Sequence, residues 1–166
     1  MNRLRDRRGF TLTELLCAVL IVLLISALLV VGIRFAGKTY NSSLKLSEAQ
    51  ELCSTLTSVI SDKLRFCGSV VSNENGDVDR IFIQDVGSVE GEGAAFRLND
   101  KQQIMLGDSE LLSAAAYPRG LQVRQISLRY DDATGIFTVT LQVGDSTDTL
   151  AETTFHVKRL NHLPTP

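Results

Sequence analysis

Histidine and cysteine are scarce in this chain of 166 residues, and proline is absent before Pro118. The two histidines and three cysteines form no cluster with metal-ligand spacing. There is also no nucleophile elbow and no cysteine–histidine pairing. These absences exclude the common catalytic arrangements, so we predict no catalytic residue, no metal site, no cofactor and no enzyme activity.

The three cysteines are also too far apart to form a disulfide framework. Cys17 lies in a long apolar run, while Cys53 and Cys67 are fourteen positions apart, about 21 Å along a helix. A disulfide needs Cα atoms within about 4.4–6.8 Å, so these two could pair only if the helix broke between them. Both lie close to an apolar stripe, and we interpret them as small buried hydrophobic residues.

Acidic pairs in predicted turns could bind calcium. These pairs are Asp77 with Asp79, Asp131 with Asp132, and Asp145 with Asp148. Because aspartate favours turns on its own account, we prefer a structural interpretation of all three.

Charge is unevenly distributed along the chain. The formal net charge is −2, but residues 1–9 carry four arginines and one aspartate, a net +3 that leaves −5 for the rest. The arginines before the apolar run outnumber Arg34 and Lys38 just after it, which places the N-terminus in the cytoplasm and the remainder outside. The acidic remainder lacks clustered lysine and arginine, so we expect no direct nucleic-acid binding.

A long hydrophobic run dominates the first part of the chain. From Leu15 to Ile33 only Ser26 and Gly32 are not plainly apolar, and residues 10–36 span about 40 Å as a helix. That length crosses a hydrocarbon core of about 30 Å with some tilt. The run is too long for the core of a secretory signal, and no small-residue cleavage site follows it. We therefore predict a membrane helix that remains in the mature protein.

Glu14 lies about one turn inside this run, with no lysine, arginine or histidine on the adjacent helical turns. An acid at the centre of a membrane helix costs about 2.5–3.5 kcal/mol on insertion scales, and a position near the helix end lowers that cost. Such a residue is by default functional, with a partner that comes from elsewhere. The alternative is that Glu14 has no functional partner and that its carboxylate simply extends to the water at the membrane surface.

An arginine-rich leader ends in Gly9 and Phe10, followed by Thr-Leu-Thr-Glu-Leu-Leu and the apolar helix. This start of the chain resembles the N-terminal signature of type IV prepilins and pseudopilins. In that family a prepilin peptidase cuts after the glycine and N-methylates the new first residue. The resemblance, which covers about residues 3–36, implies cleavage between Gly9 and Phe10, methylation of Phe10, and filament assembly through Phe10 and Glu14.

The resemblance also implies the partners of the chain. They are prepilin peptidase, other pilin or pseudopilin subunits, an assembly platform membrane protein and the lipid of the cytoplasmic membrane. Many major pilins have a glycine or proline midway along this helix, whereas here only Gly32 occurs, late in the run. Together with the acidic mature chain and the lack of a C-terminal cysteine pair, this favours a minor pilin or pseudopilin.

The spacing of the hydrophobic residues changes after the predicted membrane helix. Residues 37–43 are polar, and they form either a bend or the water-facing start of a continuing helix. From Leu44 to Cys67 an apolar stripe at helical spacing predicts an amphipathic helix that packs on a sheet, and Gly68 is a suitable stop. The stripe consists of Leu52, Leu56, Val59, Ile60 and Leu64, with Cys53 and Cys67 at its flanks.

Short strands are expected in the rest of the chain. Residues 68–79 are rich in turn-forming residues and predict a surface loop, and 111–118 are ambiguous. The expected strands are 80–85, 94–98, 103–106, 126–130, 137–143 and 153–160. The last three alternate in polarity and are linked by hairpin loops at 131–135 and 144–148, which predicts a three-stranded antiparallel meander.

The predicted fold class is therefore α+β, with a long N-terminal transmembrane and amphipathic helix packed on an antiparallel β-sheet. Its parts are a leader at 1–9, a transmembrane and filament-core helix at 10–36, an amphipathic second half at 37–68, and an exported sheet domain at 69–166. The pilin fold implied by the resemblance has the same architecture.

The leading hypothesis is a structural subunit of a type IV pilus-like filament that serves secretion, DNA uptake or adhesion. It starts as a single-pass protein of the cytoplasmic membrane and ends in a cell-surface filament. The alternative is a signal-anchored membrane protein whose outer domain binds a partner, which treats the joint occurrence of Gly9, Phe10 and Glu14 as accidental. An exported enzyme lacks any residues to perform catalysis.

Overall fold

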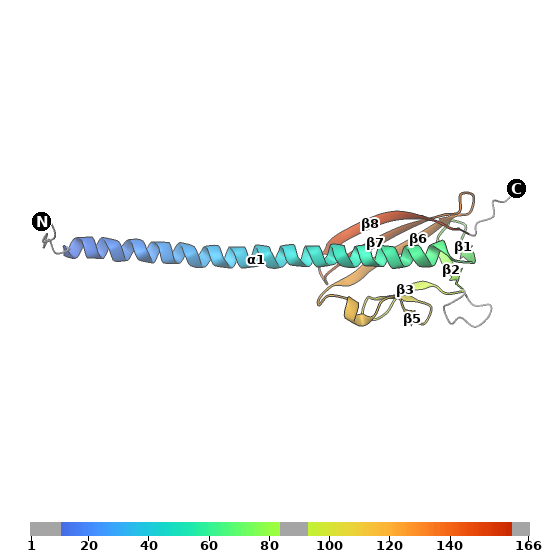
Figure 1. Ribbon diagram of the computed structural model, residues 1–166, viewed down its shortest axis with the longest axis horizontal. Coiled ribbons are helices and arrows are strands. Elements are labelled where there is room, and N and C mark those ends of the chain that lie inside the picture. Colours follow the sequence, from blue (N-terminus) through green and yellow to red (C-terminus); the bar gives the residue numbers. More distant parts are fainter. Residues whose placement is uncertain (1–10, 84–92, 161–166) are drawn as a thin grey trace, which may run out of the picture. The chain divides into compact units, whose positions relative to one another are not determined.

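The structure, a computed structural model, describes residues 11–83 and 93–160. Its contacts divide the chain into two compact units, residues 1–43 and 44–166. Helix α1 (Leu12–Arg65) is 54 residues long and contributes to both units (Figure 1). The predicted leader, Gly9 and Phe10 lie outside the described residues.

Helix α1 includes residues 37–43, so this segment is the continuing helix and not a bend. No proline interrupts α1, and its two glycines, Gly32 and Gly37, each cost only about 1 kcal/mol relative to alanine in a helix. The helix ends at Arg65, just before Cys67 and Gly68. There the Gly68 N–H donates to the Phe82 carbonyl at 2.7 Å, which directs the chain into its first strands.

One face of the second half of α1 forms part of the core of unit 44–166. Its buried residues are Ala49, Leu52, Cys53, Leu56, Ile60 and Leu64. Figure 1 shows this half of the helix beside the strands of the largest sheet. The predicted packing stripe is confirmed, except that Val59 is only half-buried and Ala49 takes a place in the core.

The largest sheet consists of β6 (Gln122–Asp131), β7 (Ile136–Gly144) and β8 (Thr149–Lys158), in the order β6-β7-β8. Both pairs are antiparallel, so the predicted meander is confirmed. The central strand β7 turns Phe137, Val139 and Leu141 fully into the core, and the residues between them are half-exposed. The Tyr130 ring on β6 packs on the Phe137 ring with centroids 4.6 Å apart.

The described part of the unit also contains two smaller sheets. One pairs β1 (Ser69–Ser72) with β2 (Val78–Phe82), and the other joins β3 (Phe96–Leu98), β4 (Ile104–Leu106) and β5 (Ser109–Glu110) in that order. The strand predicted at 103–106 is confirmed, whereas that at 80–85 begins earlier and that at 94–98 is shorter. The ambiguous segment 111–118 contains the 3₁₀ helix η1 (Ala114–Ala116).

The prediction of a surface loop at 68–79 is wrong, because β1 and the start of β2 lie there. Strand β1 pairs with β2 through its backbone, with Val71 opposite Arg80, and its side chains are mostly exposed. The connecting turn is closed by the Asn73 Oδ1 atom, which accepts hydrogen bonds from the N–H groups of Asn75 and Asp77 at 3.0 and 2.9 Å. Because this hairpin depends on backbone pairing and on hydrogen bonds in its turn, its sequence has no polar–apolar alternation from which it could be predicted.

Candidate functional site

The first turn of α1 is closed by Thr11 and Glu14. The Glu14 N–H donates to Thr11 Oγ1 at 3.3 Å. In return, Glu14 Oε2 accepts hydrogen bonds from the Thr11 N–H at 2.9 Å and from the Thr11 hydroxyl at 2.8 Å. This reciprocal arrangement is a capping box, which satisfies backbone N–H groups that have no partner inside the helix.

The capping box is not among the predictions from the sequence, although its Thr-x-x-Glu pattern is present at residues 11–14. Glu14 therefore has a hydrogen-bonding partner within the chain, but this partner is neutral. Both bonds from Thr11 end on Oε2, and Oε1 accepts no hydrogen bond among the described residues. A carboxylate at a helix N-terminus is also favoured by the helix dipole. Glu14 Oε2 can thus keep its hydrogen bonds to Thr11 while Oε1 pairs with a cation from outside the chain.

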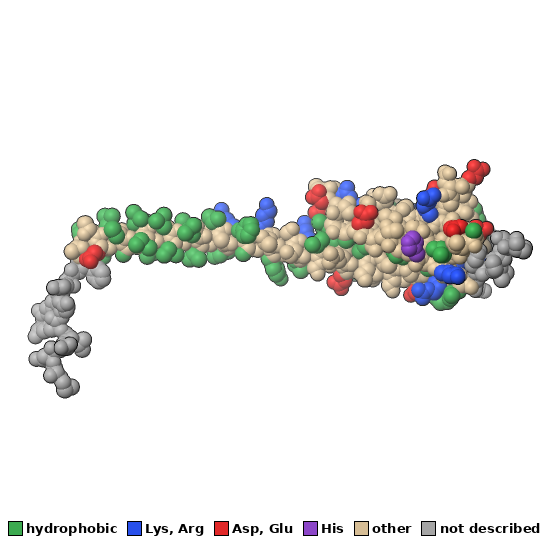
Figure 2. Space-filling view, turned by 90° about the horizontal axis from the view of Figure 1, so that it is seen from above, with side chains coloured by type: hydrophobic (Ala, Val, Ile, Leu, Met, Phe, Trp, Pro, Cys, Tyr) green, Lys and Arg blue, Asp and Glu red, His purple; other side chains and the backbone are tan. Residues whose placement is uncertain are grey.

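Apolar side chains surround the helix beyond this cap. Among the described residues, α1 is the one helix long and apolar enough to cross a membrane, and none of its most apolar window is buried within the chain. Figure 2 shows these hydrophobic side chains along the length of the exposed helix. A surface of this size in contact with water would be unfavourable, so it requires lipid or other helices around it.

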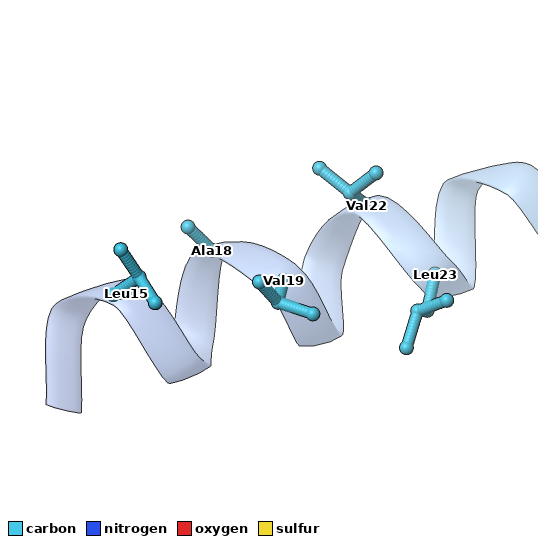
Figure 3. Close-up of a pocket in the computed structure, with 5 residues that line it drawn as sticks. All are labelled: Leu15, Ala18, Val19, Val22 and Leu23. Carbon is cyan, nitrogen blue, oxygen red and sulfur yellow. The ribbon is translucent and has the colours of Figure 1, made fainter. Parts of the chain in front are cut away.

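A shallow apolar depression lies on this surface, lined by Leu15, Ala18, Val19, Val22 and Leu23. In Figure 3 the short Ala18 side chain lies between Leu15 and Val22 along one side of the helix. Spacings of three, four and seven residues are those at which one helix receives the side chains of another. The arrangement is therefore suited to helix packing and carries no chemical group for catalysis.

The remaining candidate groups have structural roles. Burial raises the pKa values of the Cys53 and Cys67 thiols, which disfavours the reactive thiolate, and both cysteines are buried as predicted. Among the described residues no group of three or more histidine, cysteine or acidic side chains is placed to hold a metal ion. Asp145 instead accepts hydrogen bonds within its own turn, from the N–H groups of Thr147 and Asp148 at 2.9 and 2.8 Å.

Comparison with protein-family models identifies this N-terminal segment. Residues 4–32 match the prokaryotic N-terminal methylation motif. This motif is the one found at the N-terminus of type IV pilins and pseudopilins. The match includes Gly9, Phe10, Glu14 and most of the apolar run, and the long helix with its antiparallel sheets is a pilin-like architecture.

The methylation motif is typical of pilin-like structural proteins. It also implies processing by prepilin peptidase and assembly with pilins. Searches of the curated proteins and of the solved structures gave no significant match.

Proposed function

We propose that the chain is a minor pilin or pseudopilin, which is stored in the cytoplasmic membrane and then packed into a type IV pilus-like filament. Its N-terminus would lie in the cytoplasm, and unit 44–166 would lie outside. The observation that carries the proposal is the methylation motif at 4–32, joined to an apolar helix surface that the rest of the described chain leaves uncovered. The duty of the filament would be secretion, DNA uptake or adhesion.

Maturation would remove residues 1–9 by cleavage of the Gly9–Phe10 bond, followed by N-methylation of Phe10. Prepilin peptidase is the partner for both steps. Because Thr11 would then be the second residue of the mature chain, the capping box would lie beside the new amino group. The helix start would already be ordered by the chain itself when the subunit meets its neighbours.

Assembly would bury the apolar surface of α1 against the helices of other subunits, with an assembly platform protein extracting each subunit from lipid. Glu14 would pair with the methylated amine of Phe10 on a neighbour, while Oε2 keeps its hydrogen bonds to Thr11. A buried acid that loses its partner costs about 3–5 kcal/mol. This penalty would reject subunits that are out of register along the filament.

The first test is the mature N-terminus. Intact-mass analysis of protein from a host that contains the peptidase should show a chain that begins at methylated Phe10. Gly9→Val should accumulate at full length in the membrane, because a larger side chain beside the scissile bond crowds the peptidase site. Mature protein that retains Arg7 and Arg8 would instead support the signal-anchored alternative.

The second test separates the charge of Glu14 from its capping role. Glu14→Ala and Glu14→Gln should both be inserted and cleaved normally but should enter the filament poorly, although glutamine still supports a capping box. Thr11→Val is the matched control, because it weakens the cap and keeps the acid. The measurement is the ratio of sheared extracellular subunit to membrane-bound subunit. If Thr11→Val fails and Glu14→Gln assembles normally, Glu14 acts as a cap and the pairing mechanism is wrong.

A further inference from the structure

The only charged side chains between Leu15 and Ser47 are three cations, Arg34, Lys38 and Lys45. Their spacings of four and seven residues place them on one face of the helix. In Figure 2 the basic side chains beyond the apolar part of the helix lie on one side of it in this view. The Lys45 Nζ atom is 3.7 Å from the Asp145 carboxylate, whereas Arg34 and Lys38 have no acidic partner among the described residues.

The position of Arg34 matches the thickness of a membrane. Glu14 and Arg34 are twenty residues apart, which corresponds to about 30 Å along a helix and to the thickness of a hydrocarbon core. When Glu14 is at one boundary of the core, Arg34 is therefore at the other. Lys38 lies about 6 Å further along the helix, within the layer of lipid headgroups.

We propose that Arg34 and Lys38 bind the phosphate of an anionic phospholipid in the outer leaflet of the cytoplasmic membrane. The proposal rests on the membrane-stored state of the proposed function. Side chains four residues apart on a helix have Cβ atoms about 5–6 Å apart, so both cations can reach one phosphate. The guanidinium of Arg34 donates two parallel hydrogen bonds to phosphate oxygens, and the ammonium of Lys38 adds a second positive charge.

The surroundings of the two cations favour lipid over an acidic protein surface. Ile33 and Phe35, which flank Arg34 in the chain, are each 72% exposed, so hydrophobic surface adjoins the first cation. Two like charges four residues apart also destabilise a helix, and an anion between them removes this repulsion. The bound lipid would hold the subunit in the membrane until assembly extracts it.

The test is lipid retention by the full chain. The protein is reconstituted in nanodiscs of phosphatidylcholine and phosphatidylglycerol, and native mass spectrometry counts the lipids that stay bound after release. The wild-type chain should retain phosphatidylglycerol in preference to phosphatidylcholine. In the double variant Arg34→Gln with Lys38→Gln, this preference should fall about fivefold for each cation removed. The matched control, Lys101→Gln with Arg119→Gln, removes two exposed cations from unit 44–166 and should retain lipid like the wild type.

Equal phosphatidylglycerol retention by the wild type and the double variant would overturn the proposal. If retention is equal and filament incorporation of the double variant also falls, the counter-charge is a carboxylate on another subunit. Intact mass reports separately whether residues 1–9 have been removed. A chain that is never cleaved but still loses its lipid preference in the double variant would contradict the proposed function and support this lipid site.

Discussion

At the scale of single residues, Asp145 connects three parts of unit 44–166. Its carboxylate accepts hydrogen bonds from the following turn and lies 3.7 Å from the Lys45 ammonium on α1, and its carbonyl accepts from Arg124 of β6 at 3.1 Å. The turn leaves no room for a larger residue before it, because a Cβ atom on Gly144 would collide with the Asp148 carbonyl oxygen. The β7–β8 connection is thus held by hydrogen bonds within its turn and by contacts with Lys45 and Arg124.

The pH dependence of stability should reveal this role of Asp145. The hydrogen bonds from Asp148 and Thr147 hold the pKa of the Asp145 carboxyl well below its usual value, so the folded state favours the charged form. The resulting stability is present above the unfolded pKa of about 3.9 and is lost as the pH falls through the folded value. Asp145→Asn should therefore be less stable than the wild type at neutral pH, with a gap that narrows below about pH 4.

The measurement is the urea midpoint of unit 44–166 in the full chain, followed by circular dichroism across this pH range. Asp100→Asn is the matched control, because Asp100 is exposed and makes no side-chain hydrogen bond or ion pair within the described residues. Its midpoint should follow that of the wild type. A gap for Asp145→Asn that is equally large at acidic and neutral pH would show that the charge of Asp145 does not stabilise the fold.

At the scale of elements, the second half of α1 supplies one side of the core. Leu56 and Ile60 are fully buried, and so are Phe137 and Val139 of β7, in the same hydrophobic cluster. Leu56→Ala should destabilise unit 44–166 by about 2–5 kcal/mol, because it removes buried methyl groups and leaves a cavity. Ser58→Ala, on the exposed side of the same helix, should change the urea midpoint little. An unchanged midpoint for Leu56→Ala would show that the stripe does not pack on the sheet.

The elements that the sequence predicts are those whose side chains alternate between two environments. In β7, Phe137, Val139 and Leu141 face the core and residues between them do not, so a period of two is visible. Strand β1 has mostly exposed side chains and depends on backbone pairing with β2, which leaves no periodic signal. The capping box at Thr11 and Glu14 has a sequence pattern, but an acid in an apolar run equally favours an intermolecular partner. Gly9 and Phe10 remain predictions from the motif.

At the scale of the whole molecule, the two units differ in what surrounds their apolar residues. Among the residues that the structure describes, the twenty of the buried core all lie between Ala49 and Val157, within unit 44–166. The large apolar residues from Leu12 to Phe35 are exposed, and no described part of the chain covers them. Most charged side chains are in the unit that contains the core: residues 44–166 carry eleven basic and seventeen acidic side chains, a net −6. One unit therefore suits an apolar environment and the other suits water.

This division predicts that residues 44–166 form a folded, soluble monomer without the preceding helix. Deleting residues 1–43 removes none of the core side chains that the structure describes and keeps the pair between Lys45 and Asp145. The fragment should elute as a monomer in detergent-free buffer, with dispersed NMR signals and a cooperative thermal transition. A shorter fragment that starts at Ser54 is the matched comparison, because it loses Ala49, Leu52 and Cys53 from the core together with Lys45, and it should melt at a lower temperature. An aggregated or non-cooperative 44–166 fragment would mean that the apolar half of α1 stabilises the sheets, in conflict with a core that begins at Ala49.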